Sequence, residues 1–232
     1  MKPFLSIAIP TYGYNGKGGE FLTFSFDKIN NQTFKDFEIV ISDHSIDDTI
    51  KKICDEWSNI LNIKYIRNEF GRGIISPNIN VAMKNCNGSW IKILFQDDFL
   101  FDENSLETQV NYIKSNENLH WFVSQFYHSN TGHDFYRLYN PRWNEYIWTG
   151  DNTMGCPSGI TLKNEDLILF DESLNWLMDC DFYKRMKDKF GNPNILNKTT
   201  VVNRTWGNRL TDTITEELKI KEINILKEKY SI

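Results

Sequence analysis

The first hundred residues alternate between two hydrophobic periodicities, and this alternation constrains the fold more than any other feature of the sequence. Short apolar runs rich in β-branched and aromatic residues predict strands at residues 4–10, 37–41, 63–66 and 90–95. The segments between these runs carry apolar residues at helical spacing and predict helices at residues 20–30, 47–58 and 77–87. A strand–helix–strand order that occurs three times in succession predicts an α/β fold, with a mostly parallel central sheet flanked by helices.

The second half of the chain is less regular. Its pattern predicts helices at residues 102–115, 179–190 and from about Thr213 onward, and strands at residues 121–126, 159–162 and 199–203. The aromatic stretch at residues 136–149 follows neither periodicity, so we expect it to be irregular. Because no linker, repeat or low-complexity segment separates the halves, we predict one domain over residues 1–232, with a regular half at 1–98 and an irregular half at 99–232.

The charge balance limits the classes of partner. The chain has 31 acidic and 26 basic side chains, a formal net charge of −5. Since phosphate contacts to nucleic acid need clustered Lys and Arg, this balance argues against nucleic acid as the main partner, and an acidic enzyme that binds phosphates would need a metal cation. No apolar run approaches the roughly 18 residues of a membrane span, and no signal-peptide pattern precedes the first strand. These features predict a cytoplasmic protein, either free or peripheral at a membrane.

The strongest chemical motif is a pair of carboxylates, Asp97 and Asp98, directly after the apolar strand at 90–95. In α/β sheets of this kind, ligands bind beyond the carboxyl ends of the strands. Hard cations such as Mg²⁺ or Mn²⁺ prefer carboxylate and diphosphate oxygens, so the pair predicts a cation site. A simpler explanation remains open, in which both residues only cap the following turn. Asp43, at the end of the second strand, could accept a hydrogen bond from a base or ribose.

Two other motifs have ordinary structural explanations. The glycine-rich stretch at residues 13–19 lacks the spacing of a phosphate-binding loop and the Ser or Thr that should follow its lysine, so we expect a mobile loop that acts as a lid. Asp179 lies near the start of a predicted helix, where the helix dipole favours an acid. Asp181 and Arg185 have the i, i+4 spacing of a surface ion pair on that helix.

Taken together, these segments resemble the inverting family 2 glycosyltransferases of the GT-A fold over nearly the whole chain. The pair Asp97–Asp98 looks like the DXD-type motif of that family. The other matching positions, in chain order, are residues 5–12 (LSIAIPTY), 37–43 (FEIVISD), 47–49 (DDT), Asn68, Gly71, Asn78, Asn80, Ala82, Gly88, 156–159 (CPSG) and 178–181 (MDCD). The order and spacing of these segments are more specific than any single one of them.

The resemblance implies transfer of a sugar from a nucleotide-diphosphate donor to an acceptor hydroxyl, with inversion at the anomeric carbon. Residues 1–98 would form the nucleotide-sugar-binding half, and residues 99–232 would face the acceptor, a glycan or a lipid-linked or protein-linked saccharide. The implied cofactor is Mn²⁺ or Mg²⁺, which offsets the charge that builds on a leaving diphosphate.

The resemblance also assigns roles to individual residues. Thr11 and Asp43 would hold the base and ribose, Asp97 would contact the sugar-nucleotide, and Asp98 would ligate the metal. Asp179 would be the general base that removes the acceptor proton. The implied nucleotide-sugar site also includes the matching positions Pro10, Tyr12 and Asn78. We add Arg72 and Gln96 as candidates, although many relatives have an acid where this chain has Gln96.

The chain departs from the family pattern near its C-terminus. Where relatives often have a His-containing segment, this sequence has Arg204 and Arg209. Because guanidinium groups bind phosphate oxygens well, either arginine would instead contact the diphosphate.

Two alternative functions remain open at this stage. A nucleotidyltransferase of sugar phosphates can share a doubly wound sheet and an acidic metal site, and the Gly-Lys-Gly-Gly segment at residues 16–19 would suit its basic glycine-rich loop. A degenerate transferase fold kept as a carbohydrate-binding module would use exposed aromatic side chains to stack on sugars. Trp143, Tyr146 and Trp148 are candidates for such stacking, although core packing would explain at least half of them.

Overall fold

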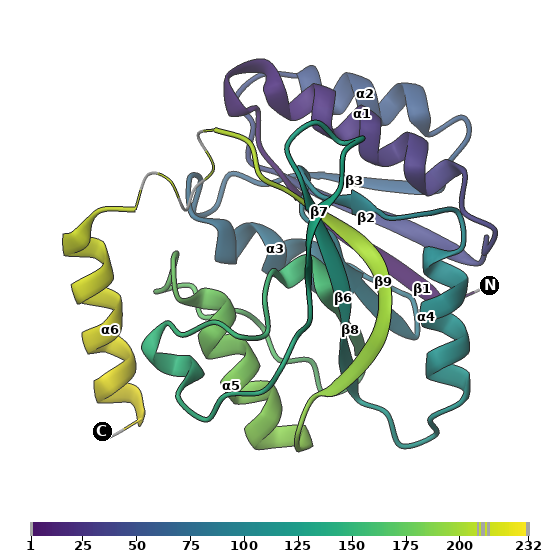
Figure 1. Ribbon diagram of the computed structural model, residues 1–232. Helices are drawn as coiled ribbons and strands as arrows, with labels where there is room; N and C mark the ends of the chain where they lie inside the picture. Colours follow the sequence, from purple (N-terminus) through teal and green to yellow (C-terminus); the bar gives the residue numbers. More distant parts are fainter. Residues whose placement is uncertain (1, 208, 210–211, 213, 231–232) are drawn as a thin grey trace.

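A computed structural model describes residues 2–207, 209, 212 and 214–230 (Figure 1). The first half contains the four predicted strands: β1 (Leu5–Thr11), β2 (Phe37–Asp43), β3 (Ile63–Arg67) and β4 (Trp90–Ile93). Three helices connect them: α1 (Lys17–Asn30), α2 (Thr49–Trp57) and α3 (Ile75–Lys84). The predicted order of elements is confirmed, and β2 extends two residues further than predicted, so that Asp43 is its last residue.

The second half adds five strands and three helices in the described residues. The strands are β5 (Phe99–Leu100), β6 (Trp121–Ser129), β7 (Tyr136–Tyr139), β8 (Ile160–Lys163) and β9 (Asn194–Arg204). The helices are α4 (Ser105–Lys114), α5 (Met178–Phe190) and α6 (Glu216–Tyr230). Thr213, where the last helix was predicted to begin, lies outside the described residues.

Two of these strands were not predicted. β5 has only two residues, too few to show a period. β7 falls in the stretch predicted to be irregular, and its side chains are mostly exposed, so they do not alternate between core and solvent. β9 begins at Asn194, five residues before the predicted start at residue 199. The prediction missed these residues because the first half of the strand carries polar side chains.

One sheet runs through both halves, in the strand order β3-β2-β1-β4-β8-β6-β9-β5, with β7 paired to β6. The strands β3, β2, β1 and β4 are all parallel to their neighbours in that block, which confirms the arrangement expected for the regular half. Beyond β4 the pairs are antiparallel except for β6 with β9. The carboxyl ends of β1, β2 and β4 therefore open toward the same edge, where ligands bind in such sheets.

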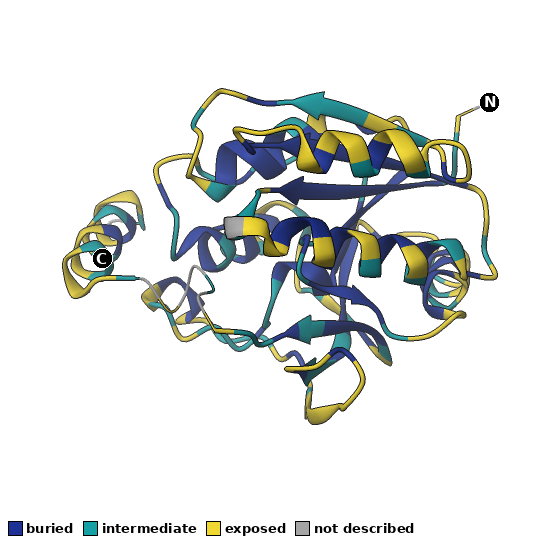
Figure 2. Cartoon of the chain, turned by 90° about the horizontal axis from the view of Figure 1, so that it is seen from above, coloured by how far each residue is buried: buried dark blue, intermediate teal, exposed yellow. Residues whose placement is uncertain are grey.

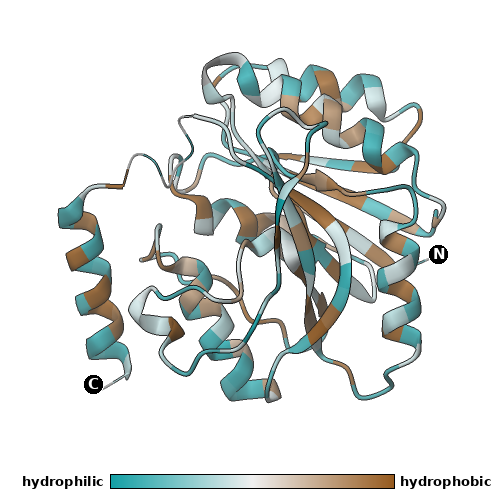
Figure 3. Cartoon of the chain, in the orientation of Figure 1, coloured by the Kyte–Doolittle hydropathy of each residue, from teal (hydrophilic) through white to brown (hydrophobic). Residues whose placement is uncertain are grey.

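Alternate residues of the central strands pack into two hydrophobic cores, one on each face (Figures 2 and 3). Ile7 and Ile39 belong to the core that includes buried residues of α1 and α2. Ala8 and Val40 belong to the opposite core, with residues of α3, α5 and α6. Burial on both faces explains why these strands read as continuous apolar runs. Among the described helices, none combines the length and apolar character needed to span a membrane.

A buried polar cluster joins the start of β1 to the turn before β4. Ser6 Oγ donates a hydrogen bond to Glu38 Oε1 at 2.6 Å and accepts one from the Gly88 N–H at 2.7 Å. The backbone of Gly88 lies so close to β1 that a Cβ atom there would stand 2.6 Å from Ser6 N. The position therefore has no room for a side chain.

We predict that Gly88→Ala lowers the free energy of unfolding by about 1–3 kcal/mol, the usual cost of overpacking a tight site. Urea denaturation followed by circular dichroism measures this change. Gly207→Ala is the control, because an added Cβ there meets nothing within 4 Å. Equal stability of the two variants would contradict the close approach.

Candidate active site

A cleft of about 230 Å³ lies where the two halves of the sheet meet. Residues that follow β4, residues at the end of β9 and the first turn of α5 all contribute to its wall. Five of the predicted site residues line it: Asp97, Asp98, Asp179, Arg204 and Arg209. Further lining residues include Tyr14, Asn152, Cys156, Asn175, Trp176 and Asn203.

The two carboxylates after β4 bond to the end of β9. Asp98 Oδ1 accepts hydrogen bonds from Asn203 Nδ2 at 3.0 Å and from the Arg204 backbone N–H at 2.9 Å. Asp97 Oδ2 accepts one from Trp206 Nε1 at 3.0 Å. These partners lie more than a hundred residues away along the chain, so the pair does more than cap the turn that follows it.

Burial raises the pKa of both carboxyl groups, because a charged carboxylate is poorly solvated there. For Asp98 the pKa rises to about 7, with repulsion from Asp97 as a second cause. For Asp97 the pKa is also raised, mainly by burial, while the hydrogen bond from Trp206 opposes the shift. A cation beside the pair would relieve the penalty of holding two neighbouring negative charges in a buried site.

The donor set at this position suits a hard divalent cation. Carboxylate oxygens of Asp97 and Asp98 face the cleft together with the side chain of Asn203, whose carbonyl oxygen is a suitable third ligand. Within the described residues no group of three or more His, Cys, Asp or Glu side chains comes together, so further ligands would come from donor phosphates and water. Sequence reasoning missed Asn203, although its position at the end of a predicted strand was the available signal.

Asp179 is the second residue of α5 and faces the same cleft. Its Oδ2 accepts a hydrogen bond from Asn152 Nδ2 at 2.7 Å, and its Oδ1 accepts one from the Cys180 N–H at 2.7 Å. Burial raises the pKa of Asp179 to about 6, against these hydrogen bonds, which lower it. A carboxylate with a pKa in this range can accept a proton near neutral pH.

Asn152, which the sequence pattern did not single out, holds Asp179 in place. Its Oδ1 accepts hydrogen bonds from the backbone N–H groups of Met154 and Gly155, and its Nδ2 also donates to the Gly155 carbonyl. The side-chain amide of Asn152 is thereby held by its own loop in the orientation from which it donates to Asp179. Its loop position and lack of periodicity explain why sequence reasoning missed it.

The predicted ion pair between Asp181 and Arg185 is confirmed, with Arg185 Nε 2.7 Å from Asp181 Oδ2. Its predicted surface location is wrong, because Asp181 is fully buried. Lys229 Nζ, at 2.7 Å, and the Tyr230 hydroxyl, at 2.6 Å, both contact Asp181 Oδ1. Asp181 is therefore a core anchor for α6, and neutralising it would disturb the packing of that helix.

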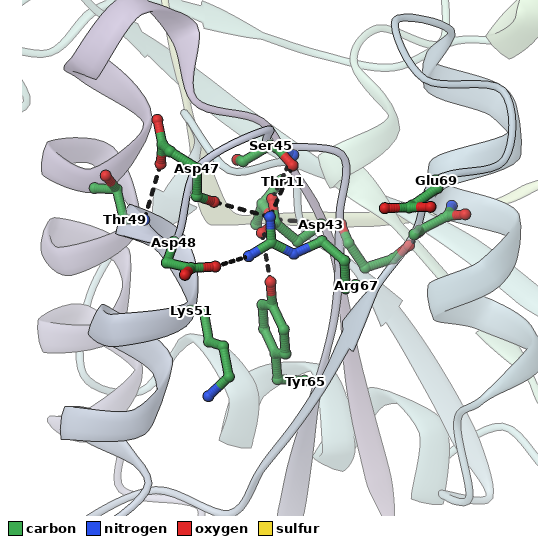
Figure 4. A network of polar contacts seen from close by, with 12 residues as sticks. Thr11, Asp43, Ser45, Asp47, Asp48, Thr49, Lys51, Tyr65, Arg67 and Glu69 are labelled. Carbon is green, nitrogen blue, oxygen red and sulfur yellow. Dashed lines mark hydrogen bonds and ion pairs between the residues drawn. The ribbon is translucent and has the colours of Figure 1, made fainter.

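A separate polar network surrounds Asp43 (Figure 4). The Asp43 carboxylate accepts hydrogen bonds from Thr11 Oγ1 at 3.2 Å, the Ser45 N–H at 2.8 Å and the Tyr65 hydroxyl at 2.7 Å. Arg67 donates to the carbonyl oxygens of residues 45 and 47, and to the Asp48 carboxylate at 2.6 Å. Asp43 is completely buried, and these protein groups occupy its carboxylate. Its carboxylate fixes the ends of β1, β2 and β3 relative to one another.

The other predicted nucleotide-sugar residues surround the same strand ends. Gln96 Oε1 accepts a hydrogen bond from the Tyr12 N–H at 2.7 Å. Asn78 Nδ2 donates to the Thr11 carbonyl at 3.0 Å. Tyr12 and Arg72 keep partly exposed side chains. The lining of the 230 Å³ cleft does not include any of these seven residues: Pro10, Thr11, Tyr12, Asp43, Arg72, Asn78 and Gln96.

The stretch at residues 13–19 is not the loop that we expected. It forms a short 3₁₀ helix, η1 (Tyr14–Gly16), and the first turn of α1. A Cβ atom on Gly18 would lie 2.0 Å from the Tyr12 carbonyl oxygen, and Gln96 Nε2 donates to the Gly18 carbonyl at 2.6 Å. This packing leaves Tyr14 facing the cleft, with its ring 5.6 Å from that of Trp206.

The two candidate arginines differ in their surroundings. The guanidinium of Arg204 lies 4.9 Å from the ring centres of Phe21 and Phe24, and its Nε donates to the Asp97 carbonyl at 3.0 Å. Arg209 pairs with Asp212 at 3.0 Å and keeps a third of its side chain exposed. Arg209 is therefore more accessible to a ligand than Arg204.

The comparison with known families agrees with this geometry. The sequence pattern described as glycosyl transferase family 2 matches residues 6–184, well over half of the chain. The chain belongs to glycosyl transferase family 2. The family 2 match begins in β1 and ends within α5, so it includes Asp43, Asp97, Asp98 and Asp179 and excludes β9 and α6.

Individual relatives of this family 2 chain are distant. It is 27% identical over 195 residues to an uncharacterized glycosyltransferase of Methanocaldococcus jannaschii, which covers 79% of this chain. The chain spans only 64% of the length of that protein. The fold is similar to S. aureus TarS 1–349 in complex with UDP-GlcNAc, with a TM-score of 0.70, 18% identity, and coverage of 97% of this chain and 66% of that one.

A second structural neighbour is the mannosyltransferase PcManGT from Pyrobaculum calidifontis in complex with GDP-Man and Mn²⁺. Its TM-score is 0.64 at 15% identity, covering 90% of this chain and 59% of that one. Both structures share the α/β fold of this chain, and the predicted fold class is confirmed.

We predict that Asp43→Ala lowers the free energy of unfolding by at least about 2 kcal/mol, because it leaves the buried Ser45 N–H and the partly buried Tyr65 hydroxyl without an acceptor. Urea denaturation measures the change. Asp48→Ala removes the exposed partner of Arg67 and should cost less than about 1 kcal/mol. A fully stable Asp43→Ala variant would show that the network does not anchor the strand ends.

Proposed function

We propose that the protein transfers a sugar from a nucleotide-diphosphate donor to an acceptor hydroxyl by a single, inverting displacement. The observation that carries this proposal is one cleft that holds a carboxylate with a pKa of about 6, Asp179, and a separate buried carboxylate pair, Asp97 and Asp98. The carboxylate of Asp179 suits a general base, and the pair of Asp97 and Asp98 suits a cation-bound diphosphate. Family membership supports the same reaction class, and the two structural neighbours carry UDP-GlcNAc and GDP-Man.

In this proposal the donor spans two groups of residues. Its base and ribose lie against the strand ends near Thr11, Asp43 and Arg72, and its diphosphate extends into the cleft toward Asp97 and Arg209. Asp98 and Asn203 would hold Mn²⁺ or Mg²⁺, which supplies charge neutralisation for the leaving diphosphate. The Mn²⁺ in the PcManGT complex supports this choice of metal.

The acceptor enters from the side of α5, past Asn175 and Trp176. Asp179 takes the proton of the attacking hydroxyl, while Asn152 keeps Oδ2 oriented through its 2.7 Å hydrogen bond. Attack from the face opposite the diphosphate inverts the anomeric carbon. The acceptor in this proposal is a glycan or a lipid-linked or protein-linked saccharide, and a cytoplasmic location would give access to nucleotide sugars.

The two alternatives have less support. A nucleotidyltransferase would use residues 16–19 as a phosphate loop, but Gly18 and Gly19 are buried in the first turn of α1. A carbohydrate-binding module would stack sugars on the three aromatic residues of the irregular stretch. Of these, Trp148 is buried and Trp143 packs against the core, leaving only Tyr146 exposed.

The first test is a panel of UDP, GDP, dTDP and CMP sugars with and without Mn²⁺. We expect one donor to be hydrolysed to its free nucleotide, and we expect EDTA to stop this hydrolysis and added Mn²⁺ to restore it. Asp98→Asn should abolish the response to Mn²⁺, because it removes the negative charge that attracts the cation. Full turnover in EDTA would contradict metal dependence. Consumption of added pyrophosphate, with formation of a nucleoside triphosphate and a sugar 1-phosphate, would favour the nucleotidyltransferase.

The second test concerns the base. Asp179→Asn should lower transfer by about 10²–10⁴-fold while donor affinity stays within twofold, because the residue acts on the acceptor. Since the base must be ionised, wild-type turnover should fall below pH 6, the pKa of Asp179, and rise above it. Bound Mn²⁺ would keep Asp98 ionised, so this acidic limb should report Asp179 and should disappear in the variant.

Asp188→Asn is the matched control, since Asp188 is an exposed residue of the same helix. Its turnover should stay within twofold of the wild type. If Asp179→Asn also retains full turnover, catalysis by this base is wrong.

A further inference from the structure

Helix α6 carries a buried carboxylate that the proposed chemistry does not use. Glu222 is 1% exposed, although glutamate is rarely buried without partners. It lies beyond the family match, which ends at residue 184. Its partners are the backbone of the segment that leads into α5, the helix that carries Asp179.

Three successive backbone N–H groups converge on this one side chain. Glu222 Oε1 accepts a hydrogen bond from Asn175 N at 2.9 Å, and Oε2 accepts from Trp176 N at 2.9 Å and Leu177 N at 2.8 Å. Consecutive N–H groups pointing into one concavity form an anion-binding nest, and here the bound anion is a side chain of the same protein. Hydrogen bonds to an ionised acceptor are about twice as strong as neutral ones, so the carboxylate fixes this segment firmly.

The segment that Glu222 holds belongs to the cleft. Asn175 and Trp176 line the cleft wall, and Leu177 precedes Met178, the first residue of α5. Asp179 follows immediately, and the first intrahelical bond runs from the Asp181 N–H to the Leu177 carbonyl at 3.0 Å. Only one residue, Met178, therefore lies between the last of these three N–H groups and the proposed base.

Helix α6 is itself held against the rest of the molecule. Leu226 is fully buried in the core that includes α5. Lys229 contacts Asp171 at 2.6 Å and Asp181 at 2.7 Å, and the Tyr230 hydroxyl donates to Asp181 at 2.6 Å. These anchors fix α6 at its C-terminal end, so that Glu222 is a fixed reference point for the start of α5.

We propose that Glu222 is a positioning residue that sets the placement of Asp179 by binding the backbone nest at residues 175–177. The inference rests on the proposed role of Asp179 as the base. Glu222 does not contact the reacting atoms. It acts on Asp179 by fixing the segment from which α5 begins. Displacements of about 1 Å at a reacting group can cost up to about 10²-fold in rate.

The substrate-free test is hydrogen–deuterium exchange. Glu222→Gln replaces one acceptor oxygen with an amide NH₂ that cannot accept the N–H groups of the nest. We expect faster exchange at residues 175–182 and little change in the strands. Glu228→Gln, the same change at an exposed position of α6, should leave the exchange of this segment unchanged. Unchanged exchange in Glu222→Gln would overturn the proposal.

The catalytic test is a double-mutant cycle with the panel donor that the wild type turns over fastest. Glu222→Gln should lower kcat by about 10–100-fold with donor KM within twofold. In the Asp179→Asn background the same change should cost less than twofold, because the residue that it positions has already been disabled.

Equal losses in both backgrounds, or kcat within twofold of the wild type, would overturn the inference. Full activity of Asp179→Asn alone would instead reject the proposed base, which separates the two failures. Should Glu222→Gln not fold, Glu222→Asp keeps the charge but shortens the reach. It should then show a smaller loss of kcat with the same dependence on Asp179, and an unaltered kcat would again overturn the proposal.

Discussion

The structure depends on the burial of Asp98 against the end of β9. Two hydrogen bonds to one carboxylate oxygen, from the Asn203 side chain and the Arg204 backbone, connect the regular half of the sheet to the antiparallel half. The residues of this contact form part of the cleft wall, and the neighbouring Asp97 accepts a hydrogen bond from Trp206 Nε1. It also carries a cost, because two adjacent carboxylates lose their hydration together. The hydrogen bonds from Asn203, Arg204 and Trp206 offset part of that cost, and a cation would offset more of it.

The polar residues at the strand ends divide into two groups. Asp43, Asn78 and Gln96 are buried and use their hydrogen-bonding capacity on the backbone or on neighbouring strands. Their first task is to hold loops in shape, and a bound nucleotide would contact the surface that they shape. Asp179 and Arg209 instead line the cleft and are only partly buried. Under the proposed function, a substitution at Asp43, Asn78 or Gln96 would therefore change both stability and nucleotide binding.

Sequence reasoning reached the strand-end residues because short apolar runs mark where each strand stops. Asp97 and Asp98 were found in this way, and so were the four parallel strands. It failed where a residue's role comes from a partner distant in the chain. Asn152 lies 27 residues from Asp179, and Glu222 lies 45 residues from Leu177. The sequence patterns around Asn152 and Glu222 do not indicate that either residue contacts the start of α5. The burial of Asp181 was missed for the same reason, since an i, i+4 pair looks identical on a surface and in a core.

The environment of Asp179 combines two opposing requirements. Burial raises its pKa, which makes it a better proton acceptor, but burial alone would also favour the neutral acid that cannot act as a base. The hydrogen bonds from Asn152 and the Cys180 N–H stabilise the charged form and leave the pKa near 6, below neutral pH. Both hydrogen bonds depend on the position of Asp179, which is set by the residue at which α5 begins. In the proposed mechanism the nest at residues 175–177 fixes that starting point, so the ionisation and the position of the proposed base depend on the same few backbone atoms.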